Sequence, residues 1–183
     1  MPYTAAMKIL ALSGSARQAS TNTALLRSLP NIAPYTSEII VFSKVSDLPV
    51  FSPDLEQPAL PEKVQGFANL VRDCDGIIIA SPEYIRAIPG GLKNAVDWLV
   101  SRDEIINKPI ALIHASHRGD DMLEQLRLVL STVSTRFTPD IFVRFALMKH
   151  TPGEIAAFLD RPENTRLLAD YLREFSEYCR GNN

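Results

Sequence analysis

The stretch MKILALSGSARQASTN, residues 7–22, joins a short apolar run to a polar loop and then to the start of a helical pattern. The run Met7–Ser13 has the length and composition of a strand that is buried on both faces. Gly14 allows the chain to turn tightly after it, and apolar residues recur at helical spacing from Asn22 onward. A buried strand that passes through a short loop into a helix is the first half of a βαβ unit. This stretch therefore predicts a parallel sheet.

The rest of the chain repeats the same alternation. Further apolar runs occupy Glu38–Phe42, Gly76–Ala80, Pro109–Ala115 and Asp140–Phe145, and helical patterns occupy Asn22–Leu29, Glu62–Cys74, Leu92–Val100, Leu123–Val133 and Glu163–Cys179. We expect four of the strands to be buried on both faces and the last helix to close the sheet edge. With right-handed crossovers, the pattern favours an α/β fold: an open, doubly wound five-stranded parallel sheet of order 2-1-3-4-5, with helices on both faces. We expect one domain over residues 1–183.

Composition excludes several classes of partner. The net charge is −2, and the Lys and Arg residues are scattered, so no nucleic acid is expected. Cys74 and Cys179 lie far apart without metal-ligand spacing, so neither a metal site nor a disulfide is expected. No segment approaches the roughly 20 apolar residues of a membrane span, and Met1–Met7 lacks the pattern of a signal peptide. We therefore expect a cytoplasmic protein with no membrane partner.

Ligands of doubly wound sheets bind at the carboxyl ends of the strands, so the loop after the first strand is the first candidate site. A helix N-terminus carries unpaired amides and a partial positive charge, which suit a phosphate. The loop adds short polar side chains and a cation: Ser15, Arg17, Ser20, Thr21 and Asn22. Neither a P-loop nor a dinucleotide fingerprint is present, so a monophosphate is the better fit. The alternative is an ordinary capped helix, because Ser, Thr and Asn are favoured caps.

The loop after the third strand is the second candidate, and it runs SPEYIRAIPGGLKNAVDW from Ser81 to Trp98. Pro82 and Pro89 stiffen it, so the backbone amides near Glu83 and Tyr84 point in fixed directions. Such amides suit the edge of a flat heteroaromatic ring such as an isoalloxazine, and Tyr84 offers an aromatic surface. The irregular stretch 49–61, with four prolines, is also expected to be functional or disordered.

The two loops together resemble the NADPH-dependent FMN reductase family of the flavodoxin-like superfamily. The matching patterns are G-S-x-R-x-x-S-x-N from Gly14 to Asn22 and S-P-E-Y-x-x-x-x-P-G-x-L-K-N-A-x-D-W from Ser81 to Trp98. Leu48–Phe51 followed by Asp54 is similar to a family segment after the second strand, and the resemblance spans about the first 115 residues. It implies bound FMN, a hydride taken from NADPH or NADH, and electrons passed to a small acceptor: a quinone, free flavin, azo compound or metal oxyanion.

The resemblance also implies roles for individual residues. Ser15, Arg17, Ser20 and Asn22, together with Thr21, would hold the FMN phosphate. Pro82, Glu83, Tyr84 and Ile85 would line the isoalloxazine ring, while Ser116, His117 and Gly119 would contact its pyrimidine end. No side chain is expected to be catalytic, because the chemistry is centred on the flavin.

The chain departs from the family pattern at two places. Ile85 follows P-E-Y where the family often has Asn, and the loop after the fourth strand reads ASHRGDD, in which only Gly119 remains of a glycine-rich segment. Bulkier residues there would reshape the loop or weaken flavin binding. His114 and His117 could form a metal pair, but no Cys or carboxylate completes one, and Asp120 and Asp121 are expected to cap a helix. The histidines are therefore expected to be structural, and the alternative is that His117 or Arg118 contacts the flavin or the nicotinamide phosphate.

Similar proteins use the helix after P-G-x-L-K-N in a dimer contact, so Trp98 is interpreted either as a core residue or as part of that contact. A homodimer or homotetramer is expected.

Two other functions stay open. One is a flavodoxin-type electron carrier, although a charge of −2 is not the strongly acidic balance of such carriers. The other is a flavin-binding protein with little turnover, as the altered loop after the fourth strand suggests.

Overall fold

The structure of the chain is a computed structural model that describes residues 6–33 and 37–181. Its centre is a five-stranded sheet of order β2-β1-β3-β4-β5 in which every neighbouring pair is parallel. The strands are β1 (Met7–Ser13), β2 (Ser37–Phe42), β3 (Gly76–Ala80), β4 (Ile110–His114) and β5 (Phe137–Arg144). The predicted sheet and its order are therefore confirmed. Residues 1–5, which include most of the segment judged not to be a signal peptide, lie outside the described residues.

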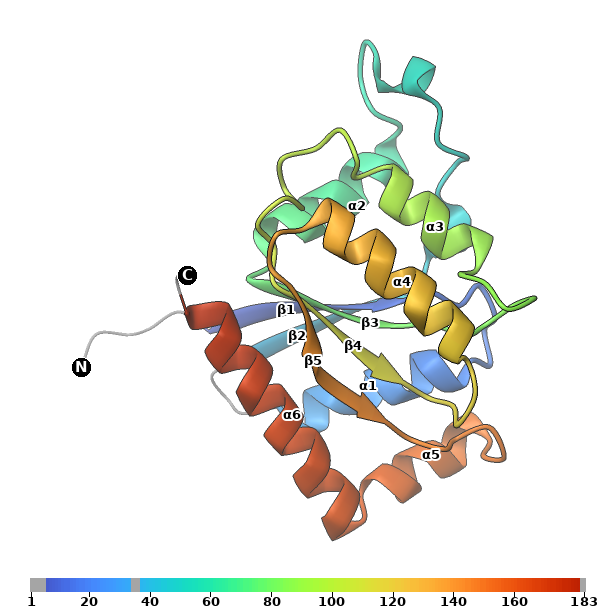
Figure 1. Cartoon of the computed structure of the whole chain (residues 1–183), viewed down its shortest axis with the longest axis vertical. Helices are drawn as coiled ribbons and strands as arrows, with labels where there is room; N and C mark the ends of the chain where they lie inside the picture. The colour runs from blue at the N-terminus through green and yellow to red at the C-terminus, as the bar shows by residue number, and fades with distance from the viewer. Residues whose placement is uncertain (1–5, 34–36, 182–183) are drawn as a thin grey trace.

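Three helices cover each face of the sheet (Figure 1). One layer consists of α1 (Thr21–Ile32), α5 (Pro152–Leu159) and α6 (Pro162–Arg180), and the other of α2 (Glu62–Asp73), α3 (Gly90–Asp97) and α4 (Asp120–Val133). Successive side chains of β1 point to opposite faces of the sheet and so pack against both helical layers. Ile9 and Ala11 belong to one apolar cluster, and Leu10 and Leu12 belong to the other. The sequence predicts five of these six helices, and α5 is the one that it does not predict.

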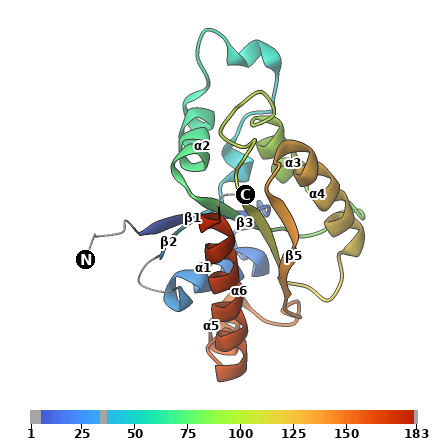
Figure 2. The ribbon, with the colours of Figure 1, turned by 60° about the vertical axis from the view of Figure 1, so that its left-hand side comes forward.

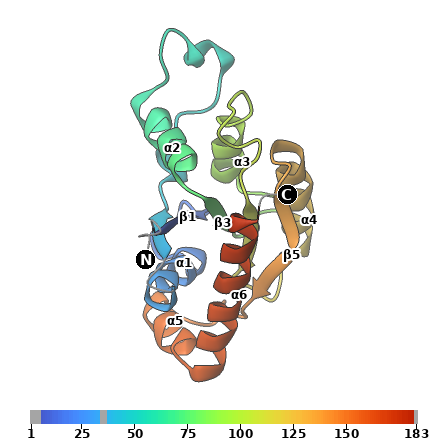
Figure 3. The ribbon, with the colours of Figure 1, turned by 90° about the vertical axis from the view of Figure 1, so that its left-hand side faces the viewer.

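Two details of the prediction are wrong. Three strands, β1, β3 and β4, are buried along nearly their whole length, whereas the edge strands β2 and β5 are only partly buried. The last helix, α6, packs on a face of the sheet instead of closing its edge (Figures 2 and 3). Its Tyr171 hydroxyl donates to the Leu112 carbonyl oxygen at 3.1 Å. A Cβ on Gly76 in β3 would meet the Cys179 Sγ of α6 at 2.5 Å, so the glycine permits this close packing.

The proline-rich stretch after β2 projects from the body of the molecule and is irregular apart from two short 3₁₀ turns, η1 (Val45–Asp47) and η2 (Pro53–Glu56) (Figure 1). It is anchored on the helix that follows β3. Asn94 Oδ1 accepts from the Phe51 amide at 2.8 Å, and the buried Trp98 donates through Nε1 to the Pro49 carbonyl oxygen at 2.7 Å. Trp98 is therefore a core residue.

All five strands point the same way, so the loops after β1, β3 and β4 all lie at the carboxyl end of the sheet. The Gly14 amide donates to the Ala80 carbonyl oxygen at 2.8 Å and joins the first two of these loops directly. A Cβ on Gly14 would lie 2.8 Å from Ser81 Oγ, so the absence of a side chain allows the two loops to lie this close together. No helix in the described part of the chain is long and apolar enough to cross a membrane.

Candidate cofactor site

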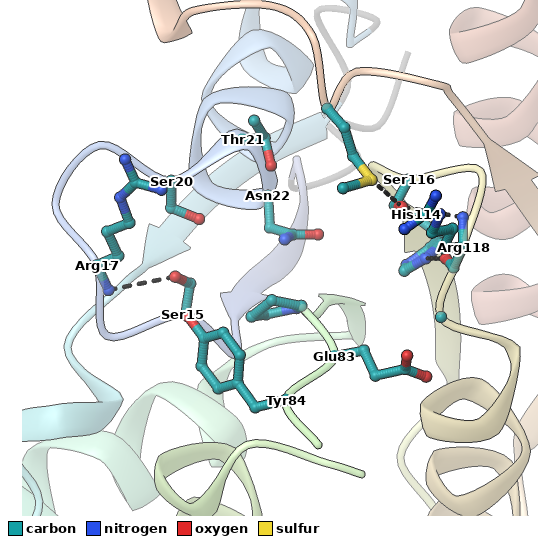
Figure 4. Close-up of a pocket in the computed structure, with 13 residues that line it drawn as sticks. Ser15, Arg17, Ser20, Thr21, Asn22, Glu83, Tyr84, His114, Ser116 and Arg118 are labelled. Atoms are coloured by element: carbon teal, nitrogen blue, oxygen red, sulfur yellow. Dashed lines mark hydrogen bonds between the residues drawn. The ribbon is translucent and has the colours of Figure 1, made fainter. Parts of the chain in front are cut away.

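A cavity of about 330 Å³ opens where these three loops meet (Figure 4). Ten of the twelve residues predicted to bind a cofactor line it; Ile85 and His117 do not. Three residues outside these twelve also line it: His114, Arg118 and Met148. The complete lining is Ser15, Arg17, Ser20, Thr21, Asn22, Pro82, Glu83, Tyr84, His114, Ser116, Arg118, Gly119 and Met148.

The N-terminus of α1 forms one wall. Ser20 is its N-cap, with extended backbone, and its Oγ accepts from the Thr23 amide at 3.3 Å. Among the described residues, the amides of Thr21 and Asn22 donate to no protein acceptor. The first turn carries no acidic side chain, so nothing on the helix neutralises its positive end. This wall is suited to an anion.

The loop leading into α1 is ordered by its own hydroxyls. Ser15 Oγ accepts from the Arg17 amide at 3.2 Å, and the buried hydroxyls of Ser13 and Thr23 lie 2.7 Å apart. The Arg17 guanidinium has no hydrogen-bond or salt-bridge partner within the described ranges. A fixed loop with an unpaired cation adds to the attraction for an anion.

The second wall is the segment 82–87, whose tip is a two-residue turn. The amides of Tyr84 and Ala87 donate to each other's carbonyl oxygens, at 3.2 and 3.1 Å. Ile85 and Arg86 both have positive φ, 52° and 59°, as a type I′ turn requires. Ile85 is 98% exposed and lies outside the pocket lining, whereas Tyr84 is half exposed and lines it. The wall thus presents Pro82 and the Tyr84 ring to a ligand.

The same segment is bonded to the N-terminus of α4. Glu83 Oε2 accepts from the Met122 amide at 3.0 Å, and the Arg86 guanidinium bonds both carboxylate oxygens of Asp121, at 2.5 and 3.2 Å. This pairing with Arg86 lowers the pKa of Asp121. Gln125 Nε2 donates to the Arg86 carbonyl oxygen at 2.8 Å. Glu83 therefore lines the pocket while its carboxylate caps a helix, which the sequence motif did not reveal.

The third wall follows β4 and is organised by His114. Its ring is buried, and Nε2 donates to the Arg118 carbonyl oxygen at 2.6 Å, while Nδ1 has no partner in the described structure. Burial lowers the pKa of His114, so the ring is neutral at pH 7. Gly119 has φ +101°, and a Cβ there would lie 2.8 Å from His114 Nε2. His114 thus lines the pocket where His117 had been predicted to do so.

Ser116 and Met148 complete this wall. Ser116 Oγ accepts from the Arg118 amide at 3.0 Å and donates to Met148 Sδ at 2.9 Å. Met148 follows β5, outside both sequence motifs, and nothing in its local sequence marks it. Within residues 6–33 and 37–181, no group of three or more His, Cys, Asp or Glu residues is placed to hold a metal ion.

Comparison with known proteins identifies the family. The sequence pattern of the NADPH-dependent FMN reductase family matches residues 7–147, which include every strand and every lining residue except Met148. The chain belongs to this family. The expected family is thus confirmed, over a longer stretch than the two loops that suggested it.

Individual relatives of this FMN reductase family member overlap it only in part. The quinone reductase of Escherichia coli (strain K12) is 37% identical over 116 residues, which are 62% of this chain and 61% of that protein. The 2-hydroxy-1,4-benzoquinone reductase of Burkholderia sp. is 39% identical over 93 residues, 51% of this chain and 50% of that protein. The chain thus matches about three fifths or less of the length of these curated relatives.

Solved structures confirm the flavodoxin-like fold. The flavoenzyme NAD(P)H:(acceptor) oxidoreductase FerB from Paracoccus denitrificans superimposes with a TM-score of 0.74 at 24% sequence identity. The match covers 94% of this chain and 97% of that chain. At this identity the likeness concerns the fold.

FMN, the cofactor of the family, fits the polar atoms that the pocket leaves unpaired. Its phosphate matches the free amides of Thr21 and Asn22 and the cation of Arg17. The buried Oδ1 of Asn22 lacks a donor in the described structure, and ribityl hydroxyls are donors of the required kind. The Tyr84 and Pro82 wall offers the apolar surface that an aromatic ring needs.

Proposed function

We propose that this chain is an FMN-dependent NAD(P)H oxidoreductase that passes reducing equivalents to a small electron acceptor. The observation that carries the proposal is the α1 N-terminus, which has two unpaired amides and no acidic residue in its first turn, beside an aromatic wall in the same cavity. Membership of the FMN reductase family supports it. FMN, when bound, supplies the hydride and electron chemistry.

The protein's own residues would bind and orient the cofactor. Ser15, Ser20, Thr21 and the adjacent amides would hold the phosphate, with Arg17 as the counter-charge. Pro82 and Tyr84 would fix the plane of the ring, and Glu83 would keep that loop in place through its bond to α4. The loop after β4, held by His114, would contact the pyrimidine end and exclude water there.

Among the acceptors that the sequence suggests, quinones have the strongest support. The E. coli and Burkholderia relatives are named as reductases of quinones. Free flavins, azo compounds and metal oxyanions remain further candidates for the acceptor. NADPH and NADH are both proposed as the hydride donor.

An anaerobic absorption spectrum tests this proposal. Protein reconstituted with FMN is expected to show a flavin spectrum that bleaches on addition of NADPH or NADH and returns when a quinone is added. A protein that takes up no FMN would overturn the proposal. Bound flavin that no nicotinamide bleaches would instead assign the chain to the electron carriers.

We also propose that the protein works as a homodimer or homotetramer. Trp98 is buried in its own chain and so is not available as a contact. Exposed apolar side chains on the projecting segment, Val50 and Leu55, support an intermolecular contact. Light scattering coupled to size-exclusion chromatography is expected to give two or four times the chain mass of 20.3 kDa, and a monomer would contradict the proposal.

A further inference from the structure

Arg118 places a second positive charge in the pocket, on the wall away from the N-terminus of α1. Figure 4 shows Arg17 beside Ser20 on one side and Arg118 beside Ser116 and His114 on the other. Both side chains line the same cavity. One phosphate at the α1 N-terminus accounts for Arg17 and leaves Arg118 without a role.

The neighbouring carboxylates do not neutralise Arg118. Asp120 bonds Arg144, and Asp121 bonds Arg86. Glu83, the single acidic residue of the lining, accepts from the Met122 amide. In the described part of the chain the Arg118 guanidinium has no hydrogen-bond or salt-bridge partner. The pocket wall therefore presents an unpaired cation.

The backbone beneath this cation is held on both sides. The Arg118 amide donates to Ser116 Oγ at 3.0 Å, and the Arg118 carbonyl oxygen accepts from the buried His114 ring at 2.6 Å. The next residue, Gly119, is fixed in a left-handed conformation against that ring. The guanidinium therefore extends from a fixed point of the wall, and less conformational freedom is lost when it binds.

We propose that Arg118 is a specificity-determining residue that favours electron acceptors carrying an anionic substituent, such as a carboxylate or a sulfonate. A planar guanidinium bonds such groups through two parallel N–H donors. The inference rests on the proposed oxidoreductase function and adds the charge of the acceptor to it. The 2′-phosphate of NADPH offers the same anionic chemistry, so the test must separate these two sources.

The test compares two acceptors, 1,4-naphthoquinone-2-sulfonate and unsubstituted 1,4-naphthoquinone, on FMN-loaded protein. NADH is the donor, because it lacks the 2′-phosphate. For each variant we take the ratio of kcat/KM for the sulfonate to that for the neutral quinone, and the comparison between variants cancels the intrinsic reactivity of the two quinones. The variants are wild type, Arg118→Gln, Arg118→Lys and a control, Arg166→Gln, which makes the same change of net charge at an exposed position on α6.

Arg118→Gln is expected to lower the ratio by up to about tenfold, because one charge-assisted contact at an exposed site is lost. Arg118→Lys should retain part of the preference, and Arg166→Gln should match wild type. A ratio that is the same in Arg118→Gln and Arg166→Gln would overturn the inference. A loss confined to kcat/KM for NADPH, with the acceptor ratio unchanged, would also overturn it and assign Arg118 to the co-substrate.

A binding measurement separates this inference from the proposed function. Turnover of the neutral quinone by wild type tests the function, whereas the ratio tests Arg118. Titration of the oxidised holoprotein with the sulfonate, followed by flavin absorbance, needs no turnover. Weaker binding in Arg118→Gln, by about tenfold, supports the inference, and equal dissociation constants contradict it.

Discussion

At the scale of single residues, the site depends on how His114, Arg118 and Gly119 fit together. The ring of His114 fills the space that a Cβ on Gly119 would need, and its Nε2 holds the Arg118 carbonyl oxygen. Sequence reading found Gly119 but predicted His117 as the histidine of the site. The residue at the end of a strand can point either way, and only the register of β4 with its neighbours decides that His114 points into the pocket.

Replacing Gly119 by Ala should destabilise the protein by about 1 to 3 kcal/mol. The left-handed backbone is strained for alanine, and the new Cβ would meet His114 Nε2 at 2.8 Å. Urea unfolding of the FMN-free protein measures the change. Gly66→Ala is the control, because Gly66 lies within helix α2 with no atom within 4 Å of a Cβ, and that change should stabilise by up to about 1 kcal/mol. Equal effects of the two substitutions would contradict this account.

His114 should make stability depend on pH. Burial lowers its folded-state pKa below the ordinary 6.5, so the unfolded chain binds the extra proton first. The stability contributed by the neutral ring is complete above about pH 6.5 and is lost as the pH falls toward the folded-state pKa. Between pH 7 and pH 5, the free energy of unfolding measured with urea should fall less for His114→Gln than for wild type. Replacing the exposed His117 by Gln should leave the fall as large as it is in wild type. A fall of wild-type size in both variants would contradict the assignment.

At the scale of elements, two helices begin at the pocket, but only one is free to bind an anion. The first turn of α4 contains Asp120 and Asp121, and the Glu83 carboxylate bonds its Met122 amide. The first turn of α1 has no acid and leaves amides unpaired. The phosphate is therefore expected at α1. Both the hydroxyl-rich loop and the acids at the start of α4 are visible in the sequence, which is why this part of the site could be predicted.

Other elements could not be predicted equally well. The sequence pattern starts β5 at Asp140, but the strand begins at Phe137, because pairing with Ile110 of β4 extends it across a register shift. Helix α5 was missed, since Pro152 and Gly153 at its start suggest a loop. Its signal was present as a capping box, in which Thr151 and Glu154 bond each other's backbone amides. Met148 depends on where the chain turns after β5, which local sequence does not encode.

The two-residue turn at Ile85 and Arg86 should be stabilised by the substitution Ile85→Asn. A β-branched residue at positive φ is strained, Asn adopts this conformation readily, and the fully exposed side chain of Ile85 has no packing to lose. We expect an increase in the free energy of unfolding of about 1 kcal/mol, measured by urea unfolding. Ile85→Val, which stays β-branched, is the control and should match wild type. Equal stability of the Asn and Val variants would contradict the strain argument.

At the scale of the whole molecule, the sheet separates two apolar clusters, and the site lies at the carboxyl ends of its strands. The two cysteines report on this core. Cys74, the C-cap residue of α2, is buried, and Cys179 on α6 is partly buried, which raises the pKa of its thiol to about 12. The raised pKa keeps the Cys179 thiol protonated at pH 8, so labelling of the folded protein is expected to be slow. Iodoacetamide should modify both cysteines slowly, and urea should accelerate both reactions in parallel with global unfolding. Fast labelling of either cysteine without urea would contradict the packing described.

We propose that the α1 N-terminus binds the phosphate of FMN, and a comparison of FMN with riboflavin, which lacks the phosphate, tests this claim. Quenching of flavin fluorescence gives both dissociation constants for wild type, Arg17→Gln and the control Arg27→Gln, an exposed arginine on α1 outside the pocket lining. Wild type and Arg27→Gln are expected to bind FMN at least about tenfold more tightly than riboflavin, and Arg17→Gln should weaken FMN binding alone. Equal affinity of wild type for FMN and riboflavin would contradict the claim.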